Sequence, residues 1–105
     1  MDRAAVLDEL KTAVRGMKAA HPEIEEVLLF GSLARDEAVP GSDADLLVIL
    51  SSADEPFLGR IPRYLPGGLS VGVDAFPYTR AEIAAMLQDG NLFIEQALAE
   101  GIRIG

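Results

Sequence analysis

Two short apolar runs, "EVLLF" (residues 26–30) and "DLLVIL" (45–50), constrain the fold of this chain more than any other feature. Neither run alternates apolar with polar residues, as a strand with one solvent-facing side would. Unbroken apolar runs of this length are typical of strands that are covered on both faces. With "VGVDAF" (71–76) as a third strand, the sequence predicts an α/β fold. We expect a small mixed sheet of three strands, with the C-terminal "IRI" as an optional fourth, packed with helices.

A helix is predicted near the N-terminus by apolar residues that recur at spacings of three and four. We expect it to run from about Arg3 to Ala19, with Asp2 as its N-cap and the pair His21-Pro22 as its end. His21 is the only histidine of the chain, and we interpret it as part of the helix stop rather than as a metal ligand. The recurring apolar residues are Val6, Leu7, Leu10, Ala13, Val14 and Met17.

Two further helices are predicted in the C-terminal part. "TRAE" (79–82) forms a capping box, in which the Thr79 hydroxyl and the Glu82 side chain satisfy exposed backbone donors. The pair Gly90-Asn91 breaks this helix, and "LFIEQALAE" forms the next one. The stretch 54–68 is expected to form a short, broken helix because it contains several prolines. Three residues of the helix after the capping box are expected to face inward: Ile83, Met86 and Leu87.

Length and composition exclude several classes of protein. With 105 residues we expect a single domain, 1–105. A net charge of -8 argues against nucleic acid as a partner, because a polyanion is normally held by Lys and Arg. No apolar stretch approaches the roughly 20 residues of a membrane span, and the N-terminus lacks a signal-peptide core. The absence of cysteine excludes disulfides and thiolate chemistry. We therefore expect a soluble, cytoplasmic protein with no membrane partner.

Two aspartates, Asp43 and Asp45, stand at the entrance of the apolar run 45–50. Residues two apart in a strand project to the same side, so these carboxylates would repel each other unless a divalent cation neutralised them. Oxygen-only ligands suit Mg²⁺ or Mn²⁺, which is usually held by a few carboxylates together with the phosphates of a substrate. The alternative interpretation is an Asp-rich turn that leads into a strand.

A pair of small residues, Gly31-Ser32, directly follows the first apolar run. Glycine lets the backbone approach a ligand closely, and a serine that opens a short helix offers its hydroxyl and free amides to a phosphate. The alternative is an ordinary N-cap serine. If the strands are antiparallel neighbours, this phosphate site and the two acids share one cleft. A third acid in a candidate strand, Asp74, would complete a set that can hold two metal ions about 3.5 to 4 Å apart.

The stretch "GSLARDEAVPGSDADLLVIL", followed by "VDAFPYT", resembles the minimal nucleotidyltransferases of the DNA polymerase beta superfamily. Their pattern is Gly-Ser, then Ala-Arg-Gly, then Ser-Asp-x-Asp-Leu, and a later strand Asp. The resemblance covers nearly the whole chain. One departure is Asp36, which stands where the family most often has glycine; Asp tolerates a left-handed backbone but adds negative charge.

The resemblance implies a role for each matching residue. Asp43, Asp45 and Asp74 would be the catalytic metal ligands for two Mg²⁺ or Mn²⁺ ions, with Asp74 also serving the incoming hydroxyl. Arg35 would support the phosphate site, although a salt bridge to a nearby acid is equally compatible. The residues that would contact ATP or another nucleoside triphosphate are Gly31, Ser32, Arg35 and Ser42.

The implied reaction transfers a nucleoside monophosphate, AMP in the first instance, to a hydroxyl and releases pyrophosphate. The small family members that this chain resembles are commonly antitoxins, some of which adenylylate a HEPN-domain toxin. The alternatives are an antitoxin that acts by binding with weak or no catalysis, and a small-molecule nucleotidyltransferase. The expected helix 92–100 has a wide apolar surface, which could also form the interface of a homo-oligomer.

Overall fold

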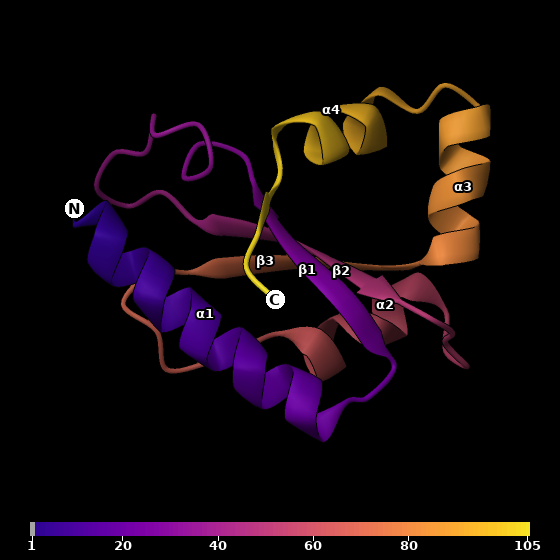
Figure 1. Cartoon of the computed structure of the whole chain (residues 1–105), viewed down its shortest axis with the longest axis horizontal. Coiled ribbons are helices and arrows are strands. Elements are labelled where there is room, and N and C mark those ends of the chain that lie inside the picture. The colour runs from indigo at the N-terminus through magenta and orange to yellow at the C-terminus, as the bar shows by residue number, and fades with distance from the viewer. Residues whose placement is uncertain (1) are drawn as a thin grey trace.

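A computed structural model of the chain describes residues 2–105 and contains one four-stranded sheet, in the order β3-β2-β1-β4 (Figure 1). β1 is antiparallel to both β2 and β4, whereas β2 and β3 are parallel, so the sheet is mixed as predicted. The optional fourth strand is present. The strands are β1 (Ile24–Phe30), β2 (Ala44–Leu50), β3 (Val73–Thr79) and β4 (Ile102–Arg103).

The helices follow the predicted signals closely. Asp2 caps the first helix by accepting a hydrogen bond from the Ala5 N–H at 3.1 Å, and His21 forms the C-cap. Thr79 and Glu82 form the capping box. The stretch rich in proline forms one short α-helix and one 3-10 helix, as expected for a broken helix. The helices are α1 (Arg3–Ala20), α2 (Phe57–Arg60), η1 (Ile61–Tyr64), α3 (Arg80–Gln88) and α4 (Leu92–Glu100).

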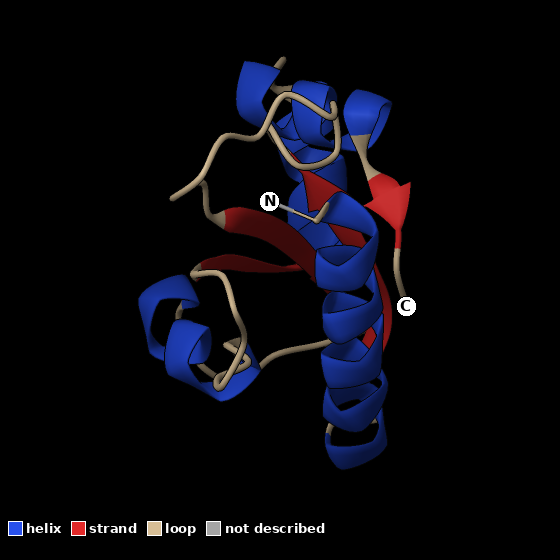
Figure 2. Cartoon of the chain, turned by 90° about the vertical axis from the view of Figure 1, so that its left-hand side faces the viewer, coloured by secondary structure: helices blue, strands red, loops and turns tan. Residues whose placement is uncertain are grey.

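The two central strands are apolar throughout because each face of the sheet is covered by helices (Figure 2). α1 and η1 pack on one face, and α3 and α4 pack on the other, which we call the α3–α4 face. Side chains of β1 and β2 alternate between the two cores. Those of the α1 face include Val27, Leu29, Leu46 and Val48, and those of the α3–α4 face include Leu28, Phe30, Leu47 and Ile49.

The strand register gathers three chain segments at one edge of the sheet. Phe30, at the end of β1, pairs with Asp45 near the start of β2. Because β3 runs parallel to β2, its first residues lie at the same edge, and Asp74 pairs with Asp45. The residues after β1, those before β2 and the start of β3 therefore meet there.

Two local predictions are wrong. Ser32 does not open a helix: residues 32–36 form successive turns whose backbone hydrogen bonds lack the regular helical spacing, and the left-handed backbone of Asp36 (φ 57°) ends them. Leu87 does not face inward but is 42% exposed, since it lies on the rim of a shallow apolar cavity between α3 and α4. Among the described residues 2–105, no helix is long and apolar enough to cross a membrane.

Candidate active site

Three acids lie at the edge of the sheet where β2 and β3 begin. Asp45 and Asp74 are direct neighbours in the parallel register, and neighbouring strands are about 4.8 Å apart. Asp43 lies just before β2, two residues ahead of Asp45, and its carboxylate packs against Gly72, the residue before the neighbouring strand β3. Burial raises the pKa of the Asp45 carboxyl above its usual value, and the charges of Asp74 and Asp43 add to this shift. The acids are therefore close enough to repel one another.

Two glycines allow this close packing of carboxylates against backbone. A Cβ atom on Gly31 would collide with Asp45 Oδ2, and one on Gly72 would collide with Asp43 Oδ1. Gly31 also has a φ of +82°, a backbone conformation that residues other than glycine rarely adopt. Two features therefore favour glycine at the position that follows β1: the positive φ and the close contact with the Asp45 carboxylate.

Of the three acids, Asp45 lines a cleft of about 360 Å³ between the turn after β1 and helix α4, whereas Asp43 and Asp74 do not line it. Gly31, Ser32, Arg35 and Asp45 line it from the sheet side, and α4 contributes residues from the opposite side. The predicted phosphate site and Asp45 therefore share one cleft, as the antiparallel pairing of β1 and β2 required. Phe93 of α4 borders the cleft and is 39% exposed.

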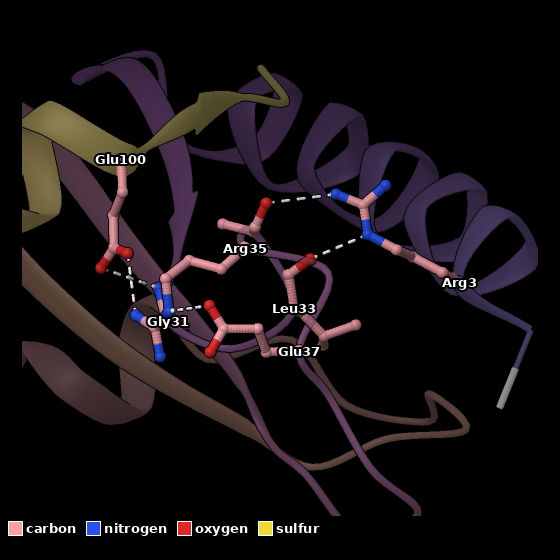
Figure 3. Close-up of polar contacts among 7 residues, drawn as sticks. Arg3, Gly31, Leu33, Arg35, Glu37 and Glu100 are labelled. Atoms are coloured by element: carbon pink, nitrogen blue, oxygen red, sulfur yellow. Dashed lines mark hydrogen bonds and ion pairs between the residues drawn. The ribbon is translucent and has the colours of Figure 1, made fainter.

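Arg35 forms salt bridges with two acids, as one of its two predicted roles requires (Figure 3). Its guanidinium donates to Glu100 Oε2 at 2.8 Å and to Glu37 Oε1 at 3.2 Å. The hydrogen bond with Glu100 raises the pKa of Arg35. Glu100 also accepts a hydrogen bond from the Gly31 N–H at 3.3 Å. Sequence reasoning missed Glu100, because nothing in the local pattern at the end of α4 connects it to residues 31–35.

Asp36 and Ser42 lie on the loop between β1 and β2. Asp36 has the left-handed backbone for which the family uses glycine, and its side chain is 78% exposed and 3.6 Å from Arg3. An arginine outside the cleft thus partly neutralises the extra charge. The Ser42 hydroxyl accepts a hydrogen bond from the Val39 N–H at 3.0 Å and closes a turn. Its contact with a nucleotide remains a prediction.

The donor chemistry of this edge suits a hard divalent cation. Asp43, Asp45 and Asp74 offer only carboxylate oxygens, and a cation would relieve the repulsion that adds to the effect of burial in raising the pKa of Asp45. Within residues 2–105, however, no group of three or more His, Cys, Asp or Glu side chains converges on one metal position. Mg²⁺ commonly takes one or two carboxylates and completes its shell with water and substrate phosphates. The residues therefore fit a metal that arrives together with a nucleotide.

Comparison with known proteins decides the family. A family model described as a nucleotidyltransferase domain matches residues 8–99. The chain belongs to this nucleotidyltransferase family. A crystal structure of a "putative nucleotidyltransferase" from Sulfolobus solfataricus resembles it with a TM-score of 0.63 and 25% sequence identity, over 79% of this chain and 75% of that chain. No curated protein matches the nucleotidyltransferase chain significantly. The family and the fold that the sequence resemblance implied are confirmed.

Proposed function

We propose that this nucleotidyltransferase uses Mg²⁺ or Mn²⁺ to transfer AMP from ATP to a hydroxyl group of a partner protein. The observation that carries the proposal is the register of β2 and β3, which places Asp74 next to Asp45, and Asp45 lines the same cleft as Gly31 and Ser32. Neighbouring carboxylates beside a turn that can bind phosphate are what a displacement at phosphorus needs.

Each part of the cleft has a role in this proposal. The turn at Gly31 and Ser32, together with Arg35, binds triphosphate oxygens through N–H and hydroxyl donors. The acids Asp43 and Asp45 hold the metal, and Asp74 serves both the metal and the acceptor hydroxyl. When bound, the metal neutralises phosphate charge and stabilises the attacking and leaving oxygens.

The proposed transfer is a single displacement. The acceptor oxygen forms a bond with the α-phosphorus, and the bond from that phosphorus to the bridging oxygen breaks, so pyrophosphate leaves with the electron pair. The hydroxyl proton passes to the Asp74 carboxylate. No nucleophile from the protein is required, because positioning and charge neutralisation carry the rate of such reactions.

An aromatic hydroxyl on a HEPN-family toxin is the acceptor that we propose. The exposed side chain of Phe93 supports this choice, since it borders the cleft and contacts Phe30 and Phe76 with ring centroids 5.6 and 5.1 Å away. A tyrosine that enters the cleft could extend this aromatic cluster while its hydroxyl approaches the acids. The resemblance to small antitoxin nucleotidyltransferases points to the same class of partner.

The test is transfer of label from ATP to the partner. Wild type, Asp43→Asn and Asp45→Asn are incubated with labelled ATP, Mg²⁺ and a candidate HEPN-domain protein, and that protein is analysed by mass spectrometry. We expect labelling by the wild type and none by either variant. Asp8→Asn, the same change at an exposed position of α1, is the matched control and should label normally. Labelling by Asp43→Asn at the wild-type rate would refute the metal assignment, and neutralisation of the toxin without label would favour the antitoxin that acts by binding.

A further inference from the structure

The last residue of α4, Glu100, lies in the cleft with its carboxylate on the phosphate-binding turn (Figure 3). One oxygen accepts from the Gly31 N–H at 3.3 Å, and the other accepts from the Arg35 guanidinium at 2.8 Å. The side chain is only 16% exposed. Both oxygens of a mostly buried carboxylate are therefore engaged by the turn after β1.

The groups that hold Glu100 are the same groups that the proposed function assigns to the triphosphate. A carboxylate oxygen and a phosphate oxygen are both anionic acceptors, so the Gly31 amide and the Arg35 guanidinium can bind either. They cannot bind both in the same geometry. A triphosphate that entered this cleft would also meet the negative charge of Glu100 beside that of Asp45.

We propose that Glu100 occupies the phosphate site in the nucleotide-free protein and is displaced when the triphosphate binds. The inference rests on the proposed function, because it takes Gly31 and Arg35 as phosphate donors. In this proposal Arg35 has both of its predicted roles. It forms the salt bridge with Glu100 in the nucleotide-free protein and contacts the phosphate in the nucleotide-bound protein.

The surroundings of Glu100 indicate how its carboxylate leaves the phosphate site. Gly101, the next residue, packs tightly against Leu28 and the Ala97 carbonyl, and Ile102 pairs with Leu29 in the sheet. The backbone at this point is thus fixed on both sides, so displacement occurs by rotation of the Glu100 side chain. The Arg35 partner of this ion pair is 38% exposed, so the pair contributes modestly to stability, and a polyanionic triphosphate can replace Glu100 there.

A second role for the same contact would be to hold Arg35 ready for the nucleotide. The two roles predict opposite changes in nucleotide affinity when the charge of Glu100 is removed. If Glu100 competes with the triphosphate, removal of its charge tightens nucleotide binding. If it positions Arg35, removal of its charge weakens binding. The sign of one affinity change therefore separates them.

The matched control is Glu37, the other acid on Arg35. It lies 3.2 Å from the Arg35 Nε on the exposed side and does not line the cleft. Glu37→Gln and Glu100→Gln remove one negative charge each and one salt bridge each from the same arginine. Any difference in ATP affinity between the two variants is therefore caused by the position of Glu100 in the cleft and not by the change in net charge.

The experiment is a calorimetric titration of ATP with Mg²⁺ into wild type, Glu100→Gln and Glu37→Gln, with thermal unfolding of each variant followed by circular dichroism. We expect Glu100→Gln to bind about three- to tenfold more tightly than Glu37→Gln, which is the fold-change that the net contribution of one typical hydrogen bond gives. Glu100→Asp, which shortens the side chain but keeps its charge, should also bind more tightly than wild type, and it decides the question if Glu100→Gln unfolds.

The outcomes separate this inference from the proposed function. Binding by the wild type with equal or weaker affinity in Glu100→Gln would overturn the displacement alone. Absence of ATP binding by every folded variant would overturn the proposed function and the displacement with it. Inorganic tripolyphosphate, titrated in the same way, should show the same order of affinities, because the contact involves no part of the nucleoside.

Discussion

Replacement of Gly31 by alanine should destabilise the fold more than any other glycine replacement at this edge. Alanine at a φ of +82° costs about 1–2 kcal/mol. Its Cβ would also collide with Asp45 Oδ2 and lie 3.3 Å from Asp45 Cγ, and overpacking of this kind costs about 1–3 kcal/mol. We therefore expect a loss of about 2–5 kcal/mol in the free energy of unfolding.

Two other glycines separate these contributions. Gly41 has a φ of +93°, but a Cβ there would meet nothing within 4 Å, so Gly41→Ala measures the backbone cost alone. A Cβ on Gly72 would collide with Asp43 Oδ1 at a position without positive φ, so Gly72→Ala measures the collision alone. Urea unfolding followed by far-UV circular dichroism gives all three values. If Gly31→Ala is no less stable than Gly41→Ala, the carboxylate of Asp45 does not pack against Gly31 and the geometry of the cleft is wrong.

Three further predictions concern side chains. Asp45→Asn should leave the metal-free protein as stable as wild type or slightly more stable in urea unfolding, because the acids repel; a large loss would indicate a structural role instead. Ser32→Ala should weaken ATP binding in calorimetry by roughly 1.5 to 3 kcal/mol, the contribution of one hydrogen bond to a charged group; a larger loss would mean that the backbone amides bind no phosphate. The hydrogen bond from buried Arg60 lowers the pKa of the Glu82 carboxyl from 4.5 to about 2. The stability that this hydrogen bond adds to the folded protein is therefore present above pH 4.5 and is lost as the pH falls toward 2. Glu82→Gln should flatten this part of the stability–pH curve, and an unchanged curve would contradict the assignment.

Local features of the fold could be predicted from the sequence because their causes are local. The N-cap of Asp2 and the capping box of Thr79 and Glu82 depend on residues within one helical turn. The unbroken apolar runs predicted strands in a sheet that is covered on both faces.

Other parts of the site depend on contacts between distant residues. Glu100 reaches Arg35 across 65 positions, and Asp36 lies beside Arg3 across the loop, so no local pattern indicates either pair. The exposure of Leu87 depends on how α3 and α4 pack together. The proximity of Asp45 and Asp74 depends on the parallel pairing of β2 and β3, and no local pattern in either strand indicates that register.

The central claim is that the acids at the start of β2 and β3 bind a nucleoside triphosphate through a divalent metal. The most direct measurement is a calorimetric titration of ATP into the wild-type protein, once with Mg²⁺ and once with EDTA. We expect binding with Mg²⁺ and none with EDTA, because the clustered carboxylates repel the phosphates until a cation bridges them. Equal affinity in the presence of EDTA would contradict the account.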